Sequence, residues 1–141
     1  VHNCRGTPDS IVKNVISQAG LKDYILFKGL VSNVAHYYQA ADMMVLLTRY
    51  DPFSNASLEA LACGCPVITT RNNGVAEVMR SFSGLVVDDI SDKKVISDCG
   101  DFILQRTFES SEIAKGVSYL SADNEKRAHL DVINQVFEEK K

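Results

Sequence analysis

Four short apolar runs, separated by helical segments, constrain the fold of this chain more than any other feature. The runs cover residues 24–27, 43–47, 67–69 and 84–87. They are continuous rather than alternating, which is typical of strands buried on both faces of a parallel sheet. The intervening segments 34–41, 56–63 and 75–79 have the spacing or end signals of short helices. This order predicts an α/β fold, a doubly wound parallel sheet with right-handed crossovers.

Helical segments are also predicted on both sides of this pattern. Residues 7–10 offer a capping residue followed by proline, and apolar residues then repeat at helical spacing until Gly20. From Ser91 onward, apolar residues fall mostly three and four positions apart, which predicts C-terminal helices with a packing face. No repeat or linker divides the chain, so we expect residues 1–141 to form a single domain. Because the sequence begins without Met, as though inside an element, we interpret it as a fragment.

Charge and cysteine spacing exclude several kinds of partner. The net charge is −3 and no stretch is rich in Lys and Arg, which argues against nucleic-acid binding. Cys63 and Cys65 are too close together for the usual zinc ligation, so we interpret the cysteines as small buried thiols of a reducing compartment. No apolar run approaches the roughly 18–20 residues that span a bilayer. These features predict a cytoplasmic protein without a metal site.

The loop after residue 47 carries the strongest candidate binding site. Ligands of parallel sheets bind outside the carboxyl ends of the strands, and this loop leads into a helix whose first N–H groups favour an anion such as a diphosphate. Asp51 lies in the loop and Glu59 about one turn inside the helix. A carboxylate can accept hydrogen bonds from the vicinal hydroxyls of a ribose. Two simpler readings stay open: Asp51 as a turn residue before Pro52, and Glu59 as an exposed helix residue.

A family resemblance covers the same region. Residues 41–68 resemble the E-x7-E region of retaining family-4 glycosyltransferases, which is shared by glycogen synthases, mannosyltransferases and lipopolysaccharide core glucosyltransferases. Similar pieces flank it: Phe27-x-Gly29 before, and Asn73-Gly74-x-x-Glu77-Val78 and the run 84–87 after. Together they cover residues 24 to 90.

The resemblance implies a fold and a reaction. The chain would be the Rossmann-like, C-terminal donor-binding half of a two-domain (GT-B) enzyme, without its first strand and helix and without the N-terminal acceptor domain. The intact protein would transfer a hexose from a UDP- or GDP-linked nucleotide-sugar donor, with retention, to a glycan or lipid-linked acceptor. No cofactor and no metal are implied. Contact with the inner face of the membrane would occur through the missing half.

The resemblance also assigns roles to individual residues. Asp51 would take the catalytic position beside the donor sugar, and Glu59 would bind the ribose. The other donor-binding residues would be the backbone donors of Phe53, Ser54 and Asn55, the pocket residue Leu58, and Gly29, Leu30 and Val31 beside the base. Catalysis in such enzymes is mainly positioning and electrostatic stabilisation of the leaving diphosphate.

The sequence departs from the family pattern at three points. Asp51 stands where Glu is usual, and Ser54-Asn55 replaces a glycine-centred loop. The Arg and Lys that clamp the diphosphate in the family would lie upstream of residue 1, so we expect the chain alone to bind its donor weakly and to be inactive. Two other functions remain open: a non-catalytic or degenerate α/β nucleotide-binding module, and a GT-B sugar-nucleotide epimerase.

Overall fold

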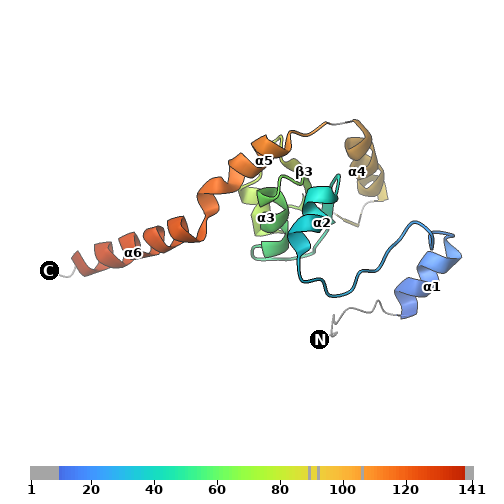
Figure 1. Ribbon diagram of the computed structural model, residues 1–141, viewed down its shortest axis with the longest axis horizontal. Helices are drawn as coiled ribbons and strands as arrows, with labels where there is room; N and C mark the ends of the chain where they lie inside the picture. Colours follow the sequence, from blue (N-terminus) through green and yellow to red (C-terminus); the bar gives the residue numbers. More distant parts are fainter. Residues whose placement is uncertain (1–9, 89, 92, 106, 139–141) are drawn as a thin grey trace. The chain divides into compact units, whose positions relative to one another are not determined.

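The computed structural model describes residues 10–88, 90–91, 93–105 and 107–138 (Figure 1). The chain forms two compact units, Val1–Val34 and Ala35–Lys141. The expectation that residues 1–141 make up one partial nucleotide-sugar-binding domain stays a prediction.

The first unit contains one described helix, α1 (Ser10–Gln18). It ends as predicted at Gly20, whose φ of 68° lets the chain turn while the amide of Leu21 donates to the carbonyl of Ile16 at 3.0 Å. The predicted capping residues 7–9 lie outside the described residues.

The predicted strand over residues 24–27 was wrong. The segment has no strand pairing, and the side chains of Tyr24 and Leu26 are 84% and 72% exposed. A strand needs a neighbour to pair its backbone N–H and C=O groups, and residues 10–34 contain no second strand. The apolar composition alone therefore did not produce a strand.

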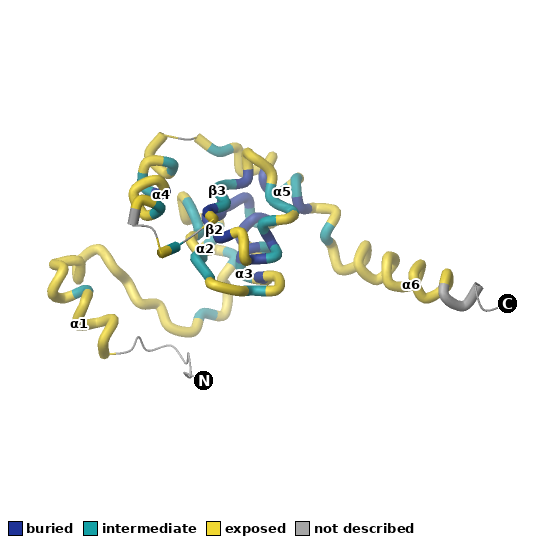
Figure 2. The backbone as a smooth tube through the Cα atoms, turned by 180° about the vertical axis from the view of Figure 1, so that it is seen from behind, coloured by how far each residue is buried: buried dark blue, intermediate teal, exposed yellow. Residues whose placement is uncertain are grey.

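A parallel sheet forms the centre of the second unit. Its strands are β1 (Met44–Leu46), β2 (Val67–Thr70) and β3 (Gly84–Val87), in the order β1-β2-β3. Both pairs are parallel, with Val67 opposite Met44 in one pair and opposite Gly84 in the other. All four residues of β2 are buried, as Figure 2 shows. The predicted strands at these positions and the parallel α/β architecture are confirmed.

Helices accompany the strands in the predicted alternation. They are α2 (Val34–Ala40), α3 (Asn55–Ala62), the short 3-10 helix η1 (Gly74–Glu77), α4 (Lys93–Gln105), α5 (Ser110–Val117), the short 3-10 helix η2 (Ser118–Leu120) and α6 (Ala122–Glu138). The apolar core has two clusters, as expected for a sheet covered on both sides. One joins Val67 to buried residues of α3 and α5, and the other joins the next residue, Ile68, to Val87 and to Cys99 of α4. Because successive side chains of a strand point to opposite faces, each cluster belongs to one face of the sheet.

Candidate active site

Two loops at the carboxyl edge of the sheet are bonded to each other. The amide of Asp51, after β1, donates to the carbonyl of Asn72 at 3.1 Å, and the amide of Gly74 donates to the carbonyl of Asp51 at 3.0 Å. A side chain at position 74 would place its Cβ 2.0 Å from the carbonyl oxygen of Pro52, so only glycine allows this close approach. The loop that carries the candidate acid is thus held against the loop after β2.

Asn73 provides the strongest side-chain contacts between these loops. It is fully buried, and its Oδ1 accepts hydrogen bonds from the amides of Ser54 and Val75, each at 3.2 Å. Its Nδ2 donates to Oγ1 of Thr69 on β2 at 2.9 Å. The sequence predicts no role for this side chain beyond its place in a family-like motif, because nothing in an Asn-Asn-Gly sequence distinguishes the asparagine that becomes buried. Asn73 therefore positions the start of α3.

Ser54 caps α3. Its Oγ accepts a hydrogen bond from the amide of Ser57 at 3.2 Å, and its carbonyl accepts from the amide of Leu58 at 3.1 Å. The amides of Asn55 and Ala56 make no hydrogen bond within the described residues. These open donors lie at the positive end of the helix, where an anion is favoured.

Replacing Ser54 by Ala should destabilise the second unit by about 1 kcal/mol, because the amide of Ser57 loses its acceptor. Urea unfolding followed by circular dichroism would measure the change. Asn55→Ala is the matched control, since its exposed side chain is not the cap, and it should unfold almost at the wild-type midpoint. Equal losses in both variants would contradict the capping role.

The candidate acid Asp51 has a local structural role as well. It is half-buried, and its Oδ1 accepts a hydrogen bond from the amide of Phe53 at 3.2 Å. The reading of Asp51 as a turn residue is therefore correct in part, and one carboxylate oxygen makes no hydrogen bond within the described residues. The amides of Phe53 and Ser54 are already paired, which leaves Asn55 as the open amide among the three predicted backbone donors.

Glu59 lies on the exposed side of α3, near α2. Tyr38 of α2 has its pKa raised by burial and, next in size, by the negative charge of Glu59. This carboxylate therefore lies within electrostatic range of the Tyr38 hydroxyl. Leu58 is half-buried and packs against the first core cluster, while the ring of Phe53 is 39% exposed. The donor roles of these residues stay predictions.

The remaining predicted donor residues belong to the other unit. Gly29 has a φ of 64°, the side chain of Leu30 is 98% exposed and Val31 is half-buried. The structure brings Asp51 and Glu59 into one unit with the α3 N-terminus, and places residues 29–31 in the first unit. The role of residues 29–31 beside the base of the donor nucleotide also stays a prediction.

A polar cavity of about 300 Å³ opens at the carboxyl ends of the three strands. Its lining consists of Thr48, Arg49, Thr70, Asn72, Asp88, Ile90 and Ser91. Arg71, beside it in sequence, pairs through Nε with the Asp88 carboxylate in an exposed ion pair. Such pairs are screened by solvent and stabilise little. The hydroxyl, amide and charged groups of the lining can all form hydrogen bonds with a polyhydroxylated ligand.

The described cysteines are buried or half-buried. Cys65 and Cys99 are buried, and burial raises the pKa of each thiol, as the predicted role of small buried thiols requires. Cys63 is half-buried, and Cys4 lies outside the described residues. Among the described residues, no group of three His, Cys, Asp or Glu side chains could hold a metal ion. No helix in this part of the protein has the length and apolar character to cross a membrane.

The family model for glycosyl transferases group 1 matches residues 6–134. This chain belongs to the group 1 glycosyl transferases. The family resemblance predicted from the sequence is therefore confirmed.

Individual relatives in the family carry several names. The chain is 31% identical over 118 residues to a lipopolysaccharide core biosynthesis mannosyltransferase, LpsB, of Rhizobium meliloti, covering 80% of this chain and 33% of that protein. It is also 31% identical over 87 residues to the N-acetyl-alpha-D-glucosaminyl L-malate synthase of Bacillus anthracis, covering 62% of this chain and 23% of that protein. This glycosyl transferase chain thus spans a third or less of these relatives.

Solved structures confirm the fold. A sucrose-phosphate synthase from Thermosynechococcus elongatus superposes with a TM-score of 0.77 at 24% identity, over 89% of this chain and 33% of that one. Anabaena Alr3699/HepE, solved in complex with UDP, gives a TM-score of 0.67 at 19% identity, over 85% of this chain and 35% of that one. The Rossmann-like α/β half of a glycosyl transferase, expected from the sequence, is the fold observed.

Proposed function

We propose that this group 1 glycosyl transferase chain binds the nucleotide-sugar donor of a hexosyltransferase. The observation that carries the proposal is the N-terminus of α3, where the amides of Asn55 and Ala56 are open and Asn73 holds the preceding loop in place. A diphosphate at this position would meet two unpaired donors and the positive end of the helix dipole. Glu59, further along the same helix, would accept hydrogen bonds from the ribose hydroxyls.

The names of relatives support the class of reaction and of donor. Relatives named mannosyltransferase and D-inositol 3-phosphate glycosyltransferase suggest hexose transfer by the intact protein. A chain of the same fold binds UDP, which supports a UDP- or GDP-linked donor. The acceptor would be a glycan or a lipid-linked sugar bound by a part of the protein outside this chain. The intact enzyme would act in the cytoplasm, in peripheral contact with the membrane through that other part.

Catalysis would depend on how the site positions the donor and the acceptor, rather than on a covalent bond between the sugar and the enzyme. The carboxylate of Asp51 would lie beside the donor sugar at the reacting centre, where its free oxygen can hold a sugar hydroxyl or stabilise developing positive charge. The open amides of α3 would stabilise the leaving diphosphate, and the acceptor oxygen would attack from the face that the diphosphate leaves, with retention. The chemistry as proposed uses no cofactor and no metal.

Glu59→Gln should weaken binding of the preferred nucleotide-sugar about tenfold or more, because a charged acceptor of the ribose hydroxyls is replaced by a neutral amide. We would titrate UDP-glucose, GDP-mannose and ADP-glucose into the chain and follow its amide shifts by NMR. Shifts at Gly29, residues 53–59 and Gly74 with one nucleotide would identify the donor and its base.

Glu112→Gln is the matched control, because Glu112 is an exposed carboxylate in the first turn of another helix, α5. It should bind as the wild type does. Unchanged affinity in the Glu59 variant would exclude the ribose role. If none of the three nucleotides shifts these residues in the folded chain, the non-catalytic module becomes the better description. An intact protein that inverts one carbon of the sugar without glycosylating an acceptor would instead be an epimerase.

A further inference from the structure

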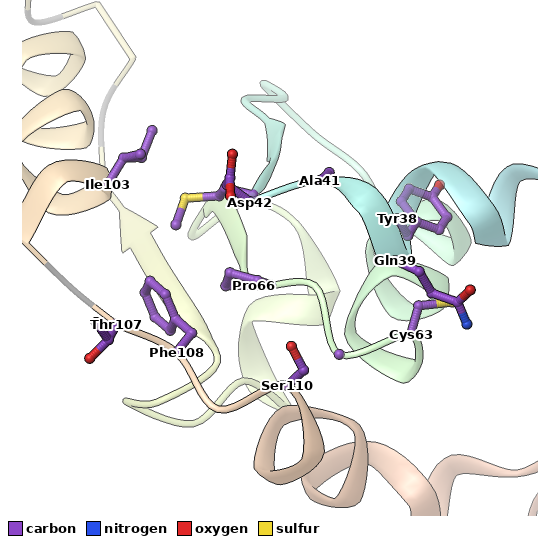
Figure 3. A pocket seen from close by; sticks show the side chains of 12 residues that line it. Tyr38, Gln39, Ala41, Asp42, Cys63, Pro66, Ile103, Thr107, Phe108 and Ser110 are labelled. Carbon is purple, nitrogen blue, oxygen red and sulfur yellow. The ribbon is translucent and has the colours of Figure 1, made fainter.

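A second cavity of the second unit lies at the edge of the sheet opposite the loops of the proposed donor site. Its volume is about 440 Å³. Met43 and Pro66 in its lining immediately precede β1 and β2, whereas the loops of the proposed donor site follow these strands. The ends of α2 and α3, Ile103 of α4 and the segment before α5 also line it (Figure 3). This cavity therefore lies at the edge of the sheet away from the loops of the proposed donor site.

Among the described residues that line the cavity, Asp42 is the one aspartate, glutamate, lysine, arginine or histidine. The Asp42 carboxylate is exposed and forms no ion pair within the described residues. Figure 3 shows it in the middle of the lining, between Ile103 on one side and Ala41 on the other. The described part of the lining therefore offers a carboxylate to a ligand.

Two helix ends add to this negative character. Gln39 lies in the last turn of α2, and Cys63 is the C-terminal cap of α3. The carbonyl oxygens of both residues accept no hydrogen bond within the described part of the chain. A helix C-terminus carries a partial negative charge and favours cations. The C-terminal ends of two helices thus lie in the same lining as the Asp42 carboxylate.

The rest of the cavity wall is suited to the methylene chain of a ligand. The ring of Phe108 and the side chains of Ile103 and Pro66 lie on the side of the cavity that holds the carboxylate, while Tyr38 lies at its other end, beyond Ala41. The volume is within the range of pockets that hold small molecules. Aromatic faces also attract ammonium groups. We propose that this cavity binds a small alkylammonium ligand, with its ammonium group at Asp42 and its methylene chain along Phe108 and Pro66.

The proposal can be tested with a pair of probes that differ in charge alone. Hexamethylenediamine, a linear diamine, should shift the amides of Asp42, Cys63, Gly64 and Phe108 in an NMR titration of the chain at neutral pH. Hexanediol has the same chain with hydroxyl ends and should shift them much less. Asp42→Asn should weaken diamine binding roughly three- to fivefold, as expected for one partly solvated ion pair.

Asp131→Asn is the matched control, because Asp131 is an exposed carboxylate of α6 that does not line the cavity. It should leave the diamine affinity unchanged. Equal weakening in both variants would show a general charge effect and overturn the proposal. Equal shifts with the diol would also overturn it, even if the Asp42 variant failed to fold. Since no nucleotide takes part, a failed donor-site experiment would leave this result intact.

Discussion

Asn73→Ala should lower the free energy of unfolding of the second unit by roughly 3–5 kcal/mol, a large loss for a single side chain. The substitution leaves the amides of Ser54 and Val75 and the hydroxyl of Thr69 without the partner that they have in the wild type. Asn73 is fully buried, so water cannot replace the lost contacts without a rearrangement of both loops. Urea unfolding would show a lower midpoint with an unchanged slope.

The same variant tests whether Asn73 positions the proposed donor site. Nucleotide-sugar affinity should be measured in conditions where the variant is fully folded. It should fall, because the hydrogen bond from the Ser54 amide to Asn73 no longer holds the start of α3. Asn72→Ala is the matched control: its side chain is exposed and makes no hydrogen bond within the described residues, and only its backbone carbonyl contacts Asp51. It should not change the free energy of unfolding by a measurable amount. Because Asn72 lines the polar cavity, the control for affinity is Asn134→Ala, an exposed side chain of α6. Similar losses of affinity in the Asn73 and Asn134 variants would refute the positioning role.

Gly84→Ala should prevent the second unit from folding to this structure, with a loss of about 4 kcal/mol or more. Gly84 begins β3 with a φ of 141°, which side chains rarely adopt. An added Cβ would lie 1.9 Å from the carbonyl oxygen of Val67 and 2.8 Å from its nitrogen. These are backbone atoms of the central strand, so neither can move away without breaking the pairing of β2 with β3. Circular dichroism and NMR dispersion would show the loss.

Gly100→Ala is the control for this second prediction. Gly100 lies inside α4, and an added Cβ would meet nothing within 4 Å. The same chemical change should there stabilise the protein by roughly 0.5–1 kcal/mol, because alanine loses less backbone freedom than glycine in a helix. A folded Gly84 variant as stable as the wild type would contradict the observed packing of β3 against Val67.

Much of the second unit could be predicted because its signals are local. The strands near residues 44–46, 67–70 and 84–87 follow from continuous apolar runs, which suit a sheet covered on both faces. The start of α3 follows from a serine that can accept a hydrogen bond three residues ahead. Asp51 and Glu59 were predicted from their spacing and from the family resemblance; both belong to the second unit, Asp51 in the loop before α3 and Glu59 inside α3, and their roles stay predictions.

The first unit contains a strand prediction that was wrong. The run 24–27 is as apolar as the strands of the sheet, yet it forms no strand. Whether such a run pairs depends on a neighbouring strand, and composition carries no information about that neighbour. The prediction failed because a strand is defined by a contact between distant segments.

The amino-acid sequence alone is enough for the parallel α/β architecture, the start of α3 and the family, since these depend on residues close together along the chain. The folded chain was needed for the role of Asn73, whose partner Ser54 lies 19 residues away, and for the Asp42 cavity, whose walls come from four separate segments. The physical reason is that a buried polar group must find its partners in space. Sequence shows which groups can form hydrogen bonds, and only the tertiary structure decides which of them are buried together.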